Sequence, residues 1–310
     1  MKKYKVNLHI TEVCNFQCRY CFAHFEKHRI LSVKEWKYII DNCYSSGMVE
    51  AINFAGGEPL LYPGLIDLVQ YVKQKGMKCS CITNASRMDE AWIRNYAGLF
   101  DTIGISADSF CEETMRCIGR KNCTGNVLTL KLLENKLRLI KQCYPAVRLK
   151  LNTVVNAVNQ NENMAEILLK HQLPVNRWKL LKMSPFDDGV HNNADLAISD
   201  EAFFRFVQNN LAVYGISIKP QDAALYHTQN KMEIVAEREL RSGYIMIDAG
   251  GYLVDDTRNS SYIRVINCLE QPFTEGLSGL NFTQELYTAR YSGITVQNGK
   301  KSLSEFIESA

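Results

Sequence analysis

The chain has 310 residues, of which 46% are hydrophobic and 22% charged, and its 36 Lys and Arg against 33 Asp and Glu give a formal net charge of +3. This composition is typical of a soluble globular protein, and the near balance of charge gives no reason to expect a nucleic acid or a membrane as partner. The first residues, MKKYKVNLHITEV, are interrupted by charge before an apolar segment builds up, and the eleven cysteines are mostly scattered. We therefore expect no signal peptide, a reducing compartment and a cytoplasmic location.

Short β-rich runs alternate with helical patterns over the first part of the chain. Strands are predicted over residues 5–11, 51–57, 78–84, 101–108, 147–155 and 176–183, and helices over 32–47, 65–76, 89–100, 126–143 and 161–172. Six strands joined by five helices with right-handed crossovers predict a parallel sheet. The expected fold class is α/β, a partial (β/α)6 TIM-type barrel.

The alternation stops at about Ser184. Residues 185–200 read as a loop, 201–215 as a helix, and 243–256 as a two-stranded hairpin that turns at 249–251. We expect residues 1–183 to form the barrel and residues 184–310 to form an extension that covers its mouth, within one globular unit.

Three cysteines follow the first predicted strand. Cys14, Cys18 and Cys21 have the spacing CxxxCxxC. Three thiolates can hold three irons of a four-iron cluster, and the absence of a nearby fourth cysteine leaves one iron open to a ligand. The alternatives are free thiols, or a zinc site completed by His24 and His28. Zinc motifs usually combine two pairs of ligands, however, and the chain has no second CxxC.

The segment AGGEP, residues 55–59, follows the second predicted strand. Gly56 and Gly57 allow the backbone to approach a ligand closely, and Glu58 can accept a hydrogen bond from an ammonium group.

Polar side chains share the inner face of the later strands, because side chains alternate across a strand. The apolar sets, expected to pack outward under helices, are Ile103, Ile105, Leu149, Leu151, Val155, Trp178 and Leu180. The opposite sets, expected to face the barrel interior, are Gly104, Ser106, Arg148, Lys150, Asn152, Arg177, Lys179 and Leu181. Buried cations need an opposite charge, and we expect too few acids on these strands to supply it. An anionic ligand would resolve the excess; alternatively, the pattern is inverted or the cations reach water at the strand ends.

The cysteine motif followed by AGGEP resembles the radical S-adenosylmethionine (SAM) superfamily. This resemblance implies a [4Fe-4S] cluster on Cys14, Cys18 and Cys21, and SAM as cofactor. The residues it implies for SAM binding are Gly56, Gly57, Glu58, Asn84, Ser86, Ser106 and Arg120.

A narrower resemblance is to viperin and its prokaryotic relatives. It is carried by ISADSF (105–110), IGR (118–120), KLNTV (150–154), VNRWK (175–179) and GYIMID (243–248), which stand in viperin-like order. The family implies a radical dehydratase that takes hydrogen from C4′ of a ribonucleoside triphosphate and yields its 3′-deoxy-3′,4′-didehydro analogue, an antiviral chain terminator. An external electron donor of flavodoxin or ferredoxin type would be needed.

Residue roles follow from the same resemblance. Arg120 would meet the SAM carboxylate and a phosphate, the substrate would bind Lys150, Asn152, Arg177 and Lys179, and Tyr244 is a candidate proton donor for loss of the 3′-hydroxyl group. The chain departs from the family pattern at FAHFEK (22–27) and at VAERELRSG (235–243), so the base stays unassigned. The alternatives are a radical SAM enzyme with another substrate, such as a peptide, and a non-catalytic iron-sulfur or zinc module.

Overall fold

The computed structural model of the chain describes residues 3–21, 23, 29–186, 192–218, 225–241, 243–256, 263–281 and 287–288. The strands are β1 Tyr4–His9, β2 Val49–Ala55, β3 Lys78–Thr83, β4 Thr102–Ser106, β5 Arg148–Val155, β6 Arg177–Lys182, β7 Leu225–His227, β8 Glu233–Glu237, β9 Ile245–Ile247, β10 Tyr252–Asp255 and β11 Ile263–Asn267. The α-helices are α1 Val33–Ser45, α2 Leu65–Gln74, α3 Glu90–Tyr96, α4 Glu112–Cys117, α5 Leu130–Cys143, α6 Met164–Lys170, α7 Asp200–Ala212 and α8 Phe273–Gly279. Short 3-10 helices are η1 Pro59–Leu61, η2 Ala97–Leu99 and η3 Ala194–Leu196.

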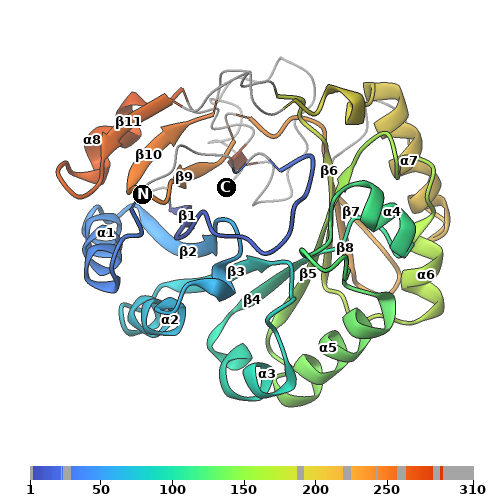
Figure 1. Cartoon of the computed structure of the whole chain (residues 1–310), viewed down its shortest axis with the longest axis horizontal. Helices are drawn as coiled ribbons and strands as arrows, with labels where there is room; N and C mark the ends of the chain where they lie inside the picture. Colours follow the sequence, from blue (N-terminus) through green and yellow to red (C-terminus); the bar gives the residue numbers. More distant parts are fainter. Residues whose placement is uncertain are drawn as a thin grey trace, which may run out of the picture.

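The predicted partial barrel is confirmed. Strands β1 to β6 pair in parallel in sequence order, and the sheet curves so that α1, α2, α3, α5 and α6 lie around its outside (Figure 1). Short α4 is an element that the sequence analysis did not predict.

Helices α1, α3, α5 and α7 begin at side-chain caps. Ser32 and Glu35 form a capping box at the start of α1, while Asp89, Thr129 and Ser199 accept hydrogen bonds from the first turns of α3, α5 and α7. Each cap satisfies a backbone N–H group that has no partner inside its helix.

The outer face of the sheet is the apolar one, as predicted. The side chains of Ile103, Ile105, Leu149, Leu151, Val155, Trp178 and Leu180 are all 0% exposed. At ~25 cal/mol per Å² of apolar surface removed from water, this layer between sheet and helices is the main source of stability for the barrel wall. The polar sets therefore face the barrel interior.

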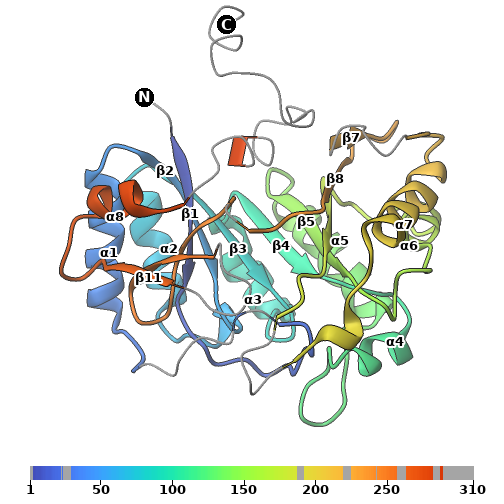
Figure 2. The same ribbon diagram turned by 90° about the horizontal axis from the view of Figure 1, so that it is seen from above.

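The C-terminal part adds strands at both edges of the same sheet. The full order is β11-β10-β9-β1-β2-β3-β4-β5-β6-β8-β7. The predicted hairpin is confirmed as β9 and β10, and β9 also pairs in parallel with β1. Figure 2 shows α8 and β11 beside α1, at the opposite end of the sheet from β7 and α7. These strands widen the barrel wall, and a division at residue 183 stays a prediction.

Strand β8 is the main difference from the sequence analysis, which predicted no strand at residues 225–237. It pairs in parallel with β6, with Arg177 opposite Glu233 and Leu181 opposite Glu237.

Within the described ranges, no helix combines the length and apolar character needed to cross a membrane.

Candidate active site

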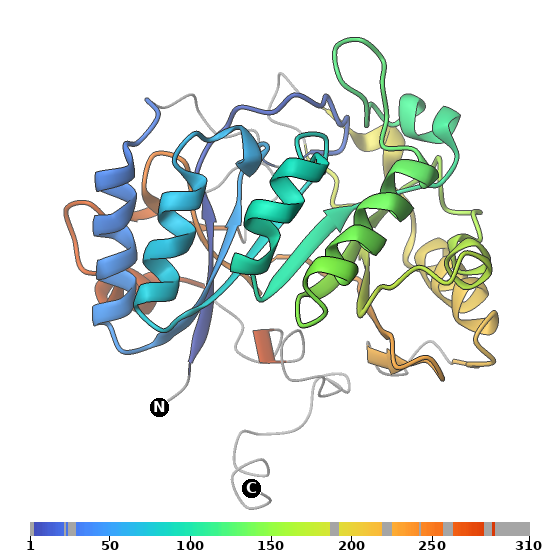
Figure 3. The same ribbon diagram turned by 90° about the horizontal axis from the view of Figure 1, so that it is seen from below.

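The cysteine loop, residues 10–21 with the three cysteines of the motif, lies at the carboxyl end of the parallel strands, where barrels of this kind place their chemistry. Figure 3 shows the dark blue segment after β1 running along the edge of the sheet to which the parallel strands point. Two other segments hold this loop in place.

The first is the AGGEP segment. The Gly57 N–H donates to the Thr11 carbonyl (2.7 Å), and the Glu58 N–H donates to the Val13 carbonyl (2.8 Å). A Cβ atom added to Gly57 would lie 2.4 Å from the Val13 carbonyl oxygen, closer than real Cβ contacts. Gly57 thus allows the backbone to approach the segment that leads into Cys14, and its role toward a ligand stays a prediction.

The second is the segment that contains IGR. The Arg19 N–H donates to the Ile118 carbonyl (3.0 Å), and the Gln17 N–H donates to the Lys121 carbonyl (3.2 Å). Between them Gly119 has a φ of +74°, and a Cβ there would lie 2.2 Å from the Gln17 carbonyl oxygen. Only glycine fits this left-handed position against the loop.

The thiols of Cys14 and Cys18 receive hydrogen bonds from donors in and around the loop. The Phe16 N–H and the Asn84 amide donate to Cys14 Sγ (3.4 and 3.9 Å), and Arg120 Nη1 donates to Cys18 Sγ (3.7 Å). Burial raises the pKa of all three thiols, that of Cys21 to about 12, while Arg120 acts in the opposite direction. Cluster ligands must be thiolates, so these donors and this cation favour the form that binds iron.

The donor set of this loop, three thiols on one segment, is of the kind that a [4Fe-4S] cluster takes. Among the described residues, no three Cys, His, Asp or Glu side chains converge closely enough to hold one metal ion. A cubane cluster instead takes each thiolate on a different iron, so its ligands can stand farther apart. His24 and His28, the ligands of the zinc alternative, lie outside the described residues.

Arg120 lies in a buried network beside the cysteine loop. Its Nε is 3.1 Å from Asp108 Oδ2, an ion pair without hydrogen-bond geometry, and its Nη2 donates to the Ser106 carbonyl (2.7 Å). Tyr20, from the cysteine loop, donates its hydroxyl to Asp108 and accepts from Arg120 Nη1 (3.3 Å). Burial by itself would lower the pKa of Arg120, but Tyr20 and Asp108 raise it above its ordinary value. Arg120 is thus a fixed positive charge next to Cys18.

Glu58 is fully buried, and its carboxylate binds the protein. It accepts hydrogen bonds from Thr83 Oγ1 (2.6 Å) and from the Asn84 N–H (2.7 Å), and burial raises its pKa. Asn84 and Ser86 both contact the cysteine loop through Asn15, at 3.0 and 2.9 Å. The structure therefore gathers the predicted SAM-binding residues around this loop, and their contacts with SAM stay a prediction.

Lys150 and Asn152 face the barrel interior from β5, as predicted. Lys150 is half-buried and has no ion pair or hydrogen bond with any residue that the structure describes. Burial, with Lys179 and Lys5 nearby, lowers its pKa well below the ordinary value. A Cβ on Gly104 of β4 would lie 2.9 Å from Lys150 Cε, so the glycine leaves room for this side chain.

The strands that carry these cations hold no acids, as expected, but the inferred excess of positive charge is smaller because the neighbouring strand β8 supplies two acids. Glu233 accepts from Arg177 Nε (2.5 Å) and from Arg148 Nη2 (3.1 Å), and these arginines lower its pKa although burial acts against them. Glu237 forms a buried ion pair with Lys179. The alternation of EIVAE, with both glutamates on one face, is the signal that could have revealed them.

Tyr244 lies within this ion pair. Its hydroxyl donates to Glu237 Oε2 (2.6 Å) and accepts from Lys179 Nζ (3.3 Å), and the ammonium also lies 5.6 Å from the centre of the Tyr244 ring. The candidate proton donor and a predicted substrate residue are thus in contact. Sequence reasoning did not identify Glu237 or Lys5 as part of this interior.

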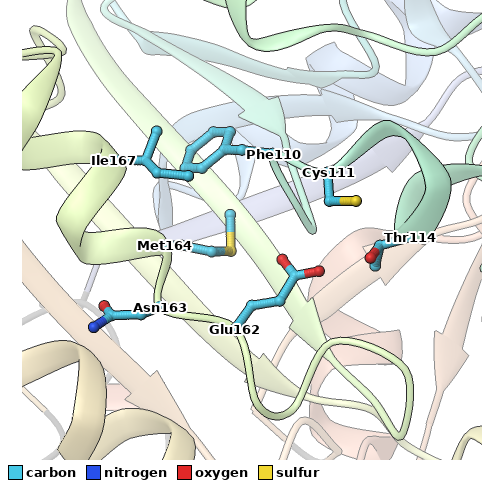
Figure 4. Close-up of a pocket in the computed structure, with 7 residues that line it drawn as sticks. All are labelled: Phe110, Cys111, Thr114, Glu162, Asn163, Met164 and Ile167. Atoms are coloured by element: carbon cyan, nitrogen blue, oxygen red, sulfur yellow. The ribbon is translucent and has the colours of Figure 1, made fainter.

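A separate hollow of about 300 Å³ lies between α4 and α6, outside the sheet (Figure 4). Phe110, Met164 and Ile167 line it, while the Glu162 carboxylate at its edge accepts a hydrogen bond from Ser109 (2.9 Å). It shares none of the predicted site residues.

Comparison with known proteins shows the class to which the chain belongs. Residues 8–158 match the Radical SAM superfamily. The structures of anSMEcpe with bound AdoMet and Cp18Cys peptide and of Streptococcus suis SuiB bound to S-adenosylmethionine have TM-scores of 0.65 and 0.64 to this chain. Identity is 16% and 12%, and coverage is 92% and 94% of this chain and 84% and 68% of theirs, so the likeness shows the fold. Fold and cysteine loop together define a radical SAM enzyme, a class that uses a [4Fe-4S] cluster and SAM.

The sequence relatives define the family more narrowly than the solved structures do. An S-adenosylmethionine-dependent nucleotide dehydratase from Selenomonas ruminantium is 37% identical over 292 residues, which is 94% of this chain and 99% of that protein. A protein of the same description from Danio rerio is 28% identical over 277 residues, 86% of this chain and 67% of its own length. The chain belongs to the viperin-like family of S-adenosylmethionine-dependent nucleotide dehydratases.

Proposed function

We propose that this enzyme converts a ribonucleoside triphosphate to its 3′-deoxy-3′,4′-didehydro analogue, an antiviral chain terminator. The observation that carries the proposal is Lys150, a cation held inside the barrel without a partner among the described residues. A buried ammonium group is costly unless an anion meets it, and a polyphosphate is such an anion.

Cys14, Cys18 and Cys21 would hold the [4Fe-4S] cluster, which together with SAM supplies a 5′-deoxyadenosyl radical able to take hydrogen from ribose C4′. An external donor of flavodoxin or ferredoxin type would supply electrons. The protein's own work is binding, orientation and exclusion of water. Arg120, held by Asp108, would receive the SAM carboxylate, and the other residues proposed to bind SAM are Gly56, Gly57, Glu58, Asn84, Ser86 and Ser106.

The inner face of β5 and β6 would bind the phosphates. Lys150 and Asn152 offer an ammonium and an amide group that the described residues leave without side-chain partners. Arg177 and Lys179 already pair with Glu233 and Glu237, so they would add hydrogen bonds to the phosphates while carrying less net charge. Lys150 is therefore expected to contribute more to affinity than either of them.

Tyr244 would donate the proton that accompanies loss of the 3′-hydroxyl group. Its hydroxyl already donates to Glu237 and accepts from Lys179, so a proton given to the substrate could be replaced from the Lys179 ammonium group.

The test is anaerobic turnover of the reconstituted enzyme with SAM, dithionite and each ribonucleoside triphosphate, with mass spectrometry of 5′-deoxyadenosine and of the nucleotide. We expect one or more nucleotides to raise 5′-deoxyadenosine and to lose water. If no triphosphate raises 5′-deoxyadenosine above the uncoupled level while a peptide does, the proposal fails and the peptide alternative stands.

A matched pair of variants tests the role of Lys150. Lys150→Ala should weaken nucleotide binding by about tenfold or more with iron content unchanged, whereas Lys170→Ala, an exposed lysine on α6, should change neither. Loss of iron in Lys150→Ala would instead indicate a folding role.

A further inference from the structure

Lys5 on β1 is a further cation of the barrel interior. Its strand neighbours Val6 and Leu8 are 0% exposed on the helix side, so alternation places Lys5, Asn7 and His9 on the inner face. The residue beside it on β2 is Ala51, whose small side chain leaves space for the lysine.

The backbone at Lys5 is fixed by a residue far along the chain. The Lys5 N–H donates to the Tyr287 hydroxyl (2.6 Å), and the Tyr287 ring packs edge-on against Tyr4 with 5.4 Å between ring centres. This anchoring sets where the Lys5 side chain starts.

The charges of β1, β5 and β6 act on one another across the interior. Burial, followed by the positive charges of Lys179 and Arg177, lowers the pKa of Lys5 to about 8, while Cys79 and Asp101 act weakly in the other direction. Lys5 and Lys179 in turn lower the pKa of Lys150, which Glu237 partly offsets. Of the acids that the structure describes, Glu233 pairs with Arg177 and Glu237 with Lys179, while Asp101 forms an exposed ion pair with Lys73.

The depth of Lys5 in the barrel distinguishes it from the other cations. The cysteine loop begins just after His9, four residues along β1 from Lys5, which at ~3.3 Å per residue is about 13 Å. A nucleotide whose ribose lies near the cysteine loop must extend its phosphate chain away from that loop. The group of the substrate that reaches deepest is the last phosphate, and it carries the most charge, about −1.5 to −2.

We propose that Lys5 binds the terminal phosphate of the nucleotide and makes the enzyme prefer triphosphates to diphosphates. This inference rests on the proposed function. Lys150 and Lys179 would hold the phosphates nearer the ribose, so Lys5 acts on the length of the phosphate chain rather than on nucleotide binding in general.

The experiment measures dissociation constants of the tri- and diphosphate of each ribonucleoside by calorimetry with the anaerobic, cluster-loaded enzyme and SAM. The wild type should bind the triphosphate more tightly. Lys5→Met and Lys5→Gln should each reduce the ratio of triphosphate to diphosphate affinity about tenfold, equivalent to ~1.4 kcal/mol, with diphosphate affinity nearly unchanged. Lys150→Met should weaken both ligands, and Lys170→Met should weaken neither.

Each outcome has one meaning. An unchanged ratio in the Lys5 variants, or an equal loss for both ligands, overturns the role of Lys5 and leaves the proposed function intact. A wild type that binds no nucleotide overturns the proposed function itself. The urea midpoint of the Lys5 variants is the control for folding, and a midpoint close to that of the wild type shows that a change in ratio does not come from misfolding.

Discussion

The buried network of Tyr20, Asp108 and Arg120 supports a quantitative prediction. Asp108 is 1% exposed; it lies beside Arg120, accepts the Tyr20 hydroxyl and accepts the Val154 N–H (2.6 Å). In Asp108→Asn the carboxylate charge is lost and Arg120 becomes an uncompensated buried cation. Breaking a buried pair in this way costs about 3–5 kcal/mol, a large share of the stability of a typical protein.

Tyr20→Phe is the matched smaller change. It removes one hydroxyl that donates to a carboxylate, a hydrogen bond of about 1.5–3 kcal/mol, and keeps the ring. Burial raises the pKa of Tyr20 well above its ordinary value, so the hydroxyl stays a neutral donor at any working pH. If Asp108 is its main partner, Tyr20→Phe should cost at least ~1 kcal/mol less in the Asp108→Asn background than in the wild type.

The assay is anaerobic urea unfolding of the wild type, the two single variants and the double variant, followed by circular dichroism. Tyr38→Phe, an exposed tyrosine on α1, is the control and should change the free energy of unfolding by less than about 0.5 kcal/mol. Additive effects of the two substitutions, within ~0.5 kcal/mol, would refute the coupling that the structure shows.

Three further predictions concern the loop and the interior charges. Gly119→Ala should reduce iron content after reconstitution and cost about 1–3 kcal/mol, since its methyl group meets the Gln17 carbonyl in a left-handed backbone, and full iron loading with unchanged stability would contradict this. Glu237→Gln should tighten nucleotide binding several-fold by freeing the charge of Lys179 while it slows product formation; weaker binding in calorimetry would count against the pairing. Nucleotide affinity should fall as pH rises through about 8, because Lys5 then loses the proton that favours an anion, and a dissociation constant that stays flat from about pH 7 to about pH 9 would argue against a titrating lysine.

The alternation of apolar and polar residues was sufficient to predict the barrel, because the outer layer of the barrel is uniformly apolar. Leu149, Leu151 and Trp178 alternate with polar residues, and this pattern fixes both the strand and the face that it buries. The same pattern placed Lys150 and Lys179 inside correctly. The cysteine motif could be predicted equally well, because its spacing is local in sequence.

Partners from distant segments could not be predicted in this way. Glu237 lies 58 residues after Lys179, and although the alternation of EIVAE puts both glutamates on one face, it does not show which strand that face lies beside. The pairing of β6 with β8 depends on the tertiary position of a segment rather than on its own propensity. Sequence reasoning therefore identified the cations of the barrel interior and missed the acids that pair with them.

The backbone hydrogen bonds that hold the cysteine loop in place also have a consequence for biosynthesis. Every backbone contact described for that loop comes from residues 11–122, whereas the outer neighbour of β1, strand β9, begins only at Ile245. At a ribosomal rate of ~5–20 residues per second, the loop and its supports emerge roughly 6 to 25 s before β9 does. During that interval the three cysteines and the residues that hold their loop are already outside the ribosome while β1 still has an open edge, which is the kind of edge that other chains can pair with.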